Sequence, residues 1–103
     1  MDYKLDISAS FEDDLDDILD YISYKLYNQV AAERLLNKAE QRISEISKNP
    51  FLYPVYPDEK ISTKGYHYAI IGNYLMFYFI DETEKVIHIA RLIYGGRDLP
   101  NQI

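Results

Sequence analysis

The sequence predicts a two-layered α+β domain in the order β-α-α-β-β-β, with an antiparallel-rich sheet packed on an α-helical hairpin. Two long segments in the first half of the chain carry apolar residues at helical spacing. The second half holds three runs rich in Tyr, Ile, Phe and Val, separated by turn sequences. The length of 103 residues fits one domain spanning 1–103.

The chain begins with a short strand and an acidic helix. Residues 3–8 alternate apolar and polar side chains, which predicts a strand with one buried face. Ser8 or Ser10 then caps a helix expected over about 11–27. Six acids follow the cap: Glu12, Asp13, Asp14, Asp16, Asp17 and Asp20. We interpret them as a solvated face rather than a carboxylate active site, and because they lack the loop spacing of a calcium site, no metal site is predicted.

A second helix is expected over about 30–47. Asn28 and Gln29 form the short break before it, which predicts an antiparallel helical hairpin. The helix must stop at Asn49-Pro50, because the residue before a proline disfavours helical geometry. Residues 51–63 are rich in proline and are predicted to form a loop whose aromatic residues anchor it to the core.

Three strands follow, over about 65–71, 74–80 and 85–94. Gly72-Asn73 supplies a tight turn between the first two, and the polar residues 81–84 supply the next reversal. Such short connections make consecutive strands antiparallel neighbours.

Both faces of the predicted sheet are largely apolar. Strict alternation separates Leu75, Phe77 and Phe79 from Tyr74, Met76, Tyr78 and Ile80, and in the last strand it separates Ile87, Ile89, Arg91 and Ile93 from Val86, His88, Ala90, Leu92 and Tyr94. The helices cover one face, so either the 51–63 loop or a partner chain should cover the other. We expect the partner to contact Tyr74, Met76 and Tyr78.

The composition of the chain disfavours several classes of function and excludes others. The net charge of −6 makes the whole chain a poor non-specific nucleic-acid binder. There is no cysteine, which excludes disulfides and thiolate metal sites. No signal peptide and no membrane span are predicted, so we expect a cytoplasmic protein with no membrane partner. We also expect that the protein needs no cofactor. Eleven tyrosines suit packing first, and interfaces or base stacking second.

Several motifs together resemble the RelE/ParE superfamily of toxins from bacterial type II toxin–antitoxin modules, a group that includes plasmid stabilisation proteins. The resemblance covers nearly the whole chain and rests on residues 14–22, Ala31-Ala32, residues 43–50, residues 74–78 and residues 91–98. It implies the β-α-α-β-β-β fold, a cognate antitoxin that wraps the toxin in a hetero-oligomer, and growth arrest when the toxin is free. RelE-like members cut mRNA in the ribosomal A site, whereas ParE-like members poison DNA gyrase.

The family's catalytic pattern carries over only in part. Leu75 stands where a RelE-like strand has arginine, and Tyr66 and Tyr68 stand roughly where it has lysines. The late catalytic tyrosine would fall near Ile103. Arg97 carries over cleanly, while Arg91 matches the ParE-like pattern.

Three further positions complete a candidate catalytic set. Tyr94 stands where many family members have histidine. His67 and Lys64 could serve as a proton donor and a phosphate contact. The full set is Arg97, Arg91, Tyr94, His67 and Lys64. We interpret His88, which lies between two isoleucines, as structural.

Three functions follow. The first is a ParE-like toxin that acts by binding DNA gyrase, which the missing cations and the net acidity favour. The second is a RelE-like ribosome-dependent endoribonuclease acting on mRNA, with the ribosome positioning the RNA. The third is a non-toxic relic that still binds its antitoxin. Whether the protein is an enzyme stays open between them.

Overall fold

A computed structural model describes residues 3–95 of the chain. The elements are β1 (Lys4–Ile7), α1 (Ala9–Asp20), the π-helical turn η1 (Tyr21–Lys25), α2 (Gln29–Lys48), α3 (Glu59–Ser62), β2 (His67–Ile71), β3 (Tyr74–Asp81) and β4 (Val86–Tyr94). The predicted order is confirmed, with α3 added inside the segment expected to be a loop. None of the helices in this described part of the chain is long and apolar enough to span a bilayer.

The sheet has the strand order β1-β4-β3-β2. β3 pairs antiparallel with both β2 and β4, while β1 pairs with β4 in parallel. Gly72 takes a positive φ of 58° in the tight turn between β2 and β3, which glycine adopts without steric cost. Residues 4–7 pair only with residues 86–89, so β1 stops beside the middle of β4.

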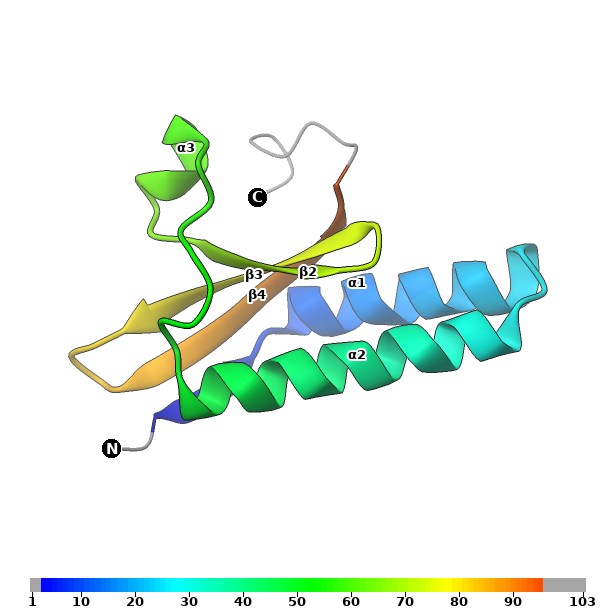
Figure 1. Ribbon diagram of the computed structural model, residues 1–103, viewed down its shortest axis with the longest axis horizontal. Helices are drawn as coiled ribbons and strands as arrows, with labels where there is room; N and C mark the ends of the chain where they lie inside the picture. Colours follow the sequence, from blue (N-terminus) through cyan, green and yellow to red (C-terminus); the bar gives the residue numbers. More distant parts are fainter. Residues whose placement is uncertain (1–2, 96–103) are drawn as a thin grey trace.

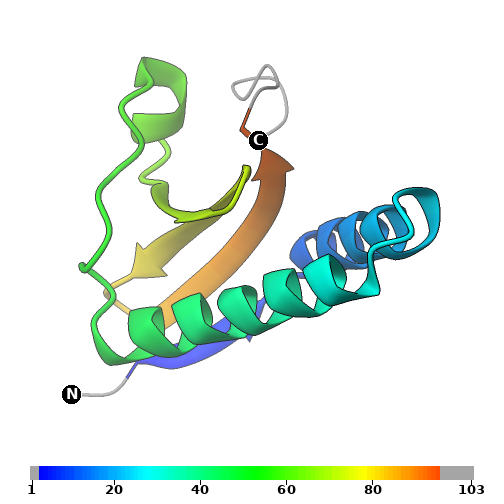
Figure 2. The same cartoon turned by 45° about the vertical axis from the view of Figure 1, so that its right-hand side comes forward.

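The two long helices form one hairpin under the sheet. Figures 1 and 2 show α1 and α2 side by side on one face, with the loop that joins them projecting beyond the sheet. Ser8 caps α1, because its Oγ accepts a hydrogen bond from the Phe11 N–H. Asn28 caps α2 in the same way through the Ala31 N–H. The chain turns between the helices at Tyr27, whose φ of 51° is left-handed.

The main core lies between the hairpin and the sheet. Its buried members come from α1, η1, α2 and all strands except β1: Phe11, Ile22, Ala32, Leu35, Ala39, Ile46, Ala69, Ile71, Met76, Tyr78, Ile87, Ile89 and Leu92. The Tyr78 hydroxyl, fully buried there, donates to the Pro50 carbonyl at 2.8 Å. This bond ties the end of the hairpin to the centre of the sheet.

The opposite face of the sheet is covered by the segment that precedes β2. Val55 forms an isolated bridge with His67, and the Tyr56 N–H donates to the Tyr66 carbonyl. A smaller core of Ile61, Phe77 and Ile93 lies beneath this segment, with Tyr56, Tyr66, Tyr68 and Leu75 around it. Of the two covers expected for this face, the structure therefore supplies the chain's own 51–63 segment.

A β-bulge interrupts the alternation of faces that was predicted for β4. Phe77 pairs with Arg91, but the next residue, Tyr78, pairs with Ile89, so Ala90 is an extra residue in β4. Because of this insertion, Ile89 and Leu92 lie in the same core. The prediction that they occupy opposite faces was wrong.

Candidate functional site

One hollow in the described part of the chain is a groove of about 580 Å³ between α1 and the end of β4. We name it the tyrosine groove and define it by its lining residues: Asp14, Asp17, Ile18, Tyr21, Tyr74, Arg91, Leu92, Ile93 and Tyr94. β1 pairs with β4 only as far as Ile89, so residues 91–94 of β4, which line the groove, lie beyond the end of β1.

An ion pair forms part of the lining of the groove. The Asp14 carboxylate accepts from Arg91 Nε at 2.7 Å and from Arg91 Nη2 at 3.0 Å. The same carboxylate accepts from the Leu92 N–H at 3.0 Å. The hydrogen bond to Asp14 raises the pKa of Arg91, an effect that partial burial opposes. Asp14 thus takes the place of a neighbouring strand at this part of the β4 edge.

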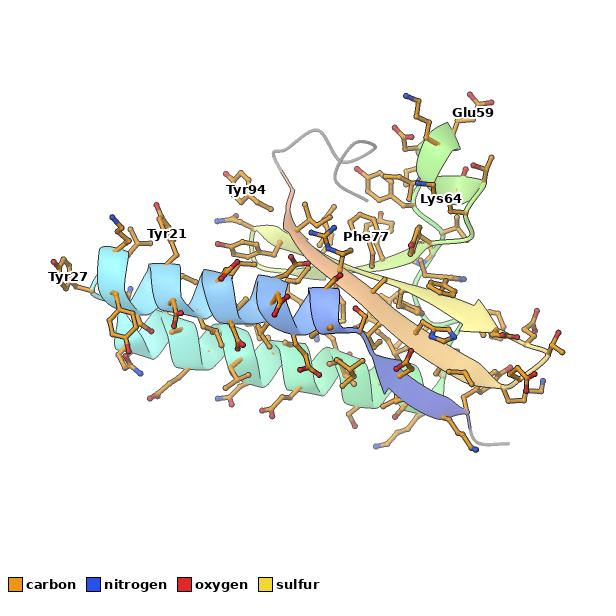
Figure 3. The ribbon with its side chains drawn as sticks, turned by 180° about the vertical axis from the view of Figure 1, so that it is seen from behind. Tyr21, Tyr27, Glu59, Lys64, Phe77 and Tyr94 are labelled. Carbon is orange, nitrogen blue, oxygen red and sulfur yellow. The ribbon has the colours of Figure 1, made fainter. Side chains whose placement is uncertain are left out.

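Three tyrosines also line the groove. The rings of Tyr74 and Tyr94 lie 5.9 Å apart at an interplanar angle of 72°, so they make two adjoining walls. Tyr21 approaches from the helical side, and Figure 3 shows it projecting on the same side of α1 as Tyr94. Burial raises the pKa of the Tyr74 phenol, with smaller contributions from the nearby Tyr21 and Tyr94 phenols. All three tyrosines therefore line the same groove.

The sheet face opposite the helices carries a second aromatic cluster. Tyr56 contacts Tyr68 and Phe77 edge to face, at ring distances of 5.0 Å and 5.4 Å. Tyr66 packs similarly against Phe79 at 5.5 Å. Figure 3 shows Phe77 in the middle of this face and Lys64 beyond it, at the end of α3. Most of these rings pack on one another, which is their structural role.

The structure brings together only part of the predicted catalytic set. Arg91 and Tyr94 line the tyrosine groove, whereas His67 and Lys64 do not. The His67 ring stacks on Tyr78 at 5.2 Å, and its Nδ1 lies 2.8 Å from the Tyr53 carbonyl.

The other basic residues considered in the sequence are Lys64, Arg97 and His88. Lys64 is exposed in the turn after α3. Arg97 lies outside the described residues. His88, interpreted as structural, stacks on Phe79 at 4.6 Å and contacts Asp6 through Nδ1 at 2.8 Å. Within residues 3–95, no group of three His, Asp or Glu side chains is placed to hold a metal ion.

The expected partner-binding face needs a correction. Met76 and Tyr78 are fully buried against the helical hairpin, so the expectation that they lie on an open face was wrong. The sequence correctly separated the side chains of β3 into two faces. The helices, however, cover the face that carries Met76 and Tyr78 rather than the opposite one. Tyr74, the third residue of that set, is half-buried and lines the tyrosine groove.

Sequence reasoning missed Asp14 and Tyr21. Asp14 was placed on a solvated face with its acidic neighbours, yet it lies three residues after Phe11 and four before Ile18. That spacing puts it beside the apolar stripe, and could have marked it as the acid that meets the sheet. Tyr21 gave no such signal, because its placement depends on the π-helical turn.

Comparisons with known proteins agree with this architecture. A family described as "ParE toxin of type II toxin-antitoxin system, parDE" matches residues 5–99. No curated protein matches the chain at a significant level.

Two solved structures share the fold. The chromosomal ParDE toxin–antitoxin system from P. aeruginosa contains a chain that matches with a TM-score of 0.71 and 16% identity, covering 89% of this chain and 95% of that one. The toxin–antitoxin complex RelBE2 from Mycobacterium tuberculosis contains a chain with a TM-score of 0.63 and 18% identity, covering 91% and 99%. With the family match over nearly its whole length, the chain belongs to the ParE toxin family of type II toxin–antitoxin systems.

Proposed function

We propose that this toxin arrests growth by binding DNA gyrase in the cytoplasm, and that a cognate antitoxin neutralises it in a hetero-oligomer. The observation that carries the proposal is the ParE family match over residues 5–99. The P. aeruginosa structure with the same fold is described as a ParDE toxin–antitoxin system, which supports an antitoxin as the partner of this chain.

The chemistry of the tyrosine groove favours binding over RNA cleavage. Cleavage at a phosphate needs cations that hold the charge developing in the transition state. Arg91, the cation among the described residues that line this groove, donates two hydrogen bonds to Asp14, and Asp17 adds another carboxylate to the lining. A phosphate entering here would meet two carboxylates beside one guanidinium, which is an unfavourable setting for an anion.

A RelE-like endoribonuclease is the second candidate, and one observation favours it. The aromatic cluster on the face opposite the helices includes the half-buried Tyr66 and Tyr68, near the turn that carries the exposed Lys64. Tyrosine rings stack on unpaired bases, and lysine binds phosphate as a point charge. A relic that binds its antitoxin without toxicity is the third outcome.

Induction of the chain alone in a bacterial host tests the proposal. Growth arrest with cleaved chromosomal DNA and without new mRNA 5′ ends is the expected result. New 5′ ends within translated codons, lost in an Arg97→Ala variant of preserved fold, would instead assign the ribosome-dependent nuclease. Growth without arrest would leave the antitoxin-binding relic.

A further inference from the structure

We propose that the tyrosine groove binds a lysine or arginine side chain carried on an apolar segment of a partner protein. The antitoxin is the partner we assign, and that assignment alone rests on the proposed function. Three features of the groove support this site: the geometry of its tyrosine rings, the charge of α1 and its apolar lining.

The walls suit a cation. A Lys or Arg side chain within about 6 Å of a tyrosine ring face is attracted by the ring quadrupole. Tyr74 and Tyr94 provide two adjoining rings at 72°, and Tyr21 lies across the groove from them. Tyr21 and Tyr94 are about half exposed, at 52% and 48%, so their rings are accessible from solvent.

The charge of the groove also selects a cation. Asp14 and Arg91 neutralise each other, which leaves Asp17 as the uncompensated charge of the lining. Asp17 is exposed and forms no ion pair with any residue in 3–95. α1 carries six acids and no base, a charge equal to the net −6 of the whole chain. This field attracts a basic segment, and it disfavours an anion or a second copy of the same acidic chain.

The apolar lining explains why the cation should come on an apolar segment. Leu92 and Ile93 are only 2% and 5% exposed, so the apolar surface that the groove opens to water comes from the half-buried Ile18 and from the rings of Tyr21 and Tyr94. A free small cation would leave this apolar surface exposed to water, whereas the neighbours of a Lys or Arg in a peptide can cover it. A volume of about 580 Å³ exceeds what one side chain fills, and it lies in the ordinary range of ligand pockets.

A peptide titration of the full chain tests the site directly. The probes are acetyl-Leu-Arg-Leu-amide, its citrulline analogue, which keeps the shape without the charge, and acetyl-Leu-Glu-Leu-amide. We expect the arginine peptide to shift the NMR signals of the Tyr21, Tyr74 and Tyr94 rings, and to bind at least about fivefold more tightly than the citrulline peptide. Equal binding of the two, tighter binding of the glutamate peptide, or no binding of any would overturn the proposal.

Matched variants locate the effect. Asp17→Asn should weaken arginine-peptide binding about three- to tenfold, whereas Asp13→Asn, an exposed acid on the same helix outside the groove, should not. Tyr94→Leu should weaken it, and Tyr24→Leu at the exposed hairpin tip should not. Equal effects within either pair would contradict the assignment.

The peptide result is independent of the toxin assay. Peptide binding at the groove without growth arrest on induction would support the site and reject the proposed function. Arrest with gyrase cleavage but no peptide binding would support the function and reject the site.

Discussion

The Asp14 carboxylate binds the Arg91 guanidinium and the Leu92 backbone N–H at once. One acidic side chain from α1 therefore satisfies the edge of β4 beyond the end of β1, and neutralises the cation that projects beside it. Ser8 serves the same edge one step earlier, because its Oγ donates to the Ala90 carbonyl at 2.8 Å. β1, Ser8 and Asp14 thus contact the same edge of β4 one after another, in the order in which they occur along the chain.

Loss of the Asp14 carboxylate should destabilise the fold. Asp14→Asn should lower the free energy of unfolding by about 1–3 kcal/mol, because a partly buried guanidinium loses a charged acceptor. Asp13→Asn, on the exposed face, should change it by less than about 0.5 kcal/mol. Urea denaturation of both variants measures the difference, and equal values would contradict the edge role of Asp14.

Met76 should matter for stability rather than for a direct contact with a partner. Met76→Ala removes a fully buried side chain and should cost about 2–5 kcal/mol of unfolding free energy. Ile70→Ala, in the neighbouring strand but 57% exposed, should cost less than about 1 kcal/mol. Similar losses for the two variants in urea denaturation would be inconsistent with the core position of Met76.

Stability should fall at alkaline pH through Tyr78. Burial raises the pKa of Tyr78 to about 12, whereas the phenol in the unfolded chain ionises near 10. Since the unfolded state loses its proton first, this stabilisation is complete below pH 10 and is lost as the pH rises from 10 to 12.

A Tyr78→Phe variant isolates that effect. The wild type should lose up to about 1.4 kcal/mol per pH unit from this group between pH 10 and 12, a slope that the variant lacks. The variant should start about 1 kcal/mol less stable at pH 8, because it lacks the bond to the Pro50 carbonyl. Parallel stability curves for the two proteins from pH 8 to 11.5 would rule out Tyr78 as the source.

The hairpin tip offers a test of backbone strain. Tyr27→Gly should raise the free energy of unfolding by about 0.5–1 kcal/mol, because Tyr27 has a φ of 51° and is 90% exposed. Tyr24→Gly, inside the π-helical turn, should lower it by about 1 kcal/mol. Destabilisation of equal size in both variants would contradict the strain.

The predictable part of this structure is the part governed by local periodicity. The apolar stripe of the first helix, the break at Asn28 and the turn at Gly72 located the hairpin and the strands within a few residues. The bulge at Ala90 was not predictable, because it inserts one residue without a Gly or Pro signal, and it changed which side chains share a face. Alternation within β3 separated its two faces correctly but could not show which of them the helices would cover, and Met76 was assigned to the wrong side.

The site was less predictable than the fold because it depends on contacts between distant segments. Arg91 and Tyr94 were singled out because they stand at motif positions of the family that the sequence resembles. Their partners Asp14 and Tyr21 come from α1 and η1, some 70 residues earlier, and no local pattern pairs them.

The most direct test of the proposed function is a cleavage assay with purified DNA gyrase, supercoiled plasmid, ATP and the purified toxin. The account predicts that linear DNA accumulates with toxin concentration after protein denaturation and proteolysis, and that prior addition of the antitoxin prevents it. Unchanged plasmid topology with a toxin preparation that arrests growth in the host would contradict gyrase as the target.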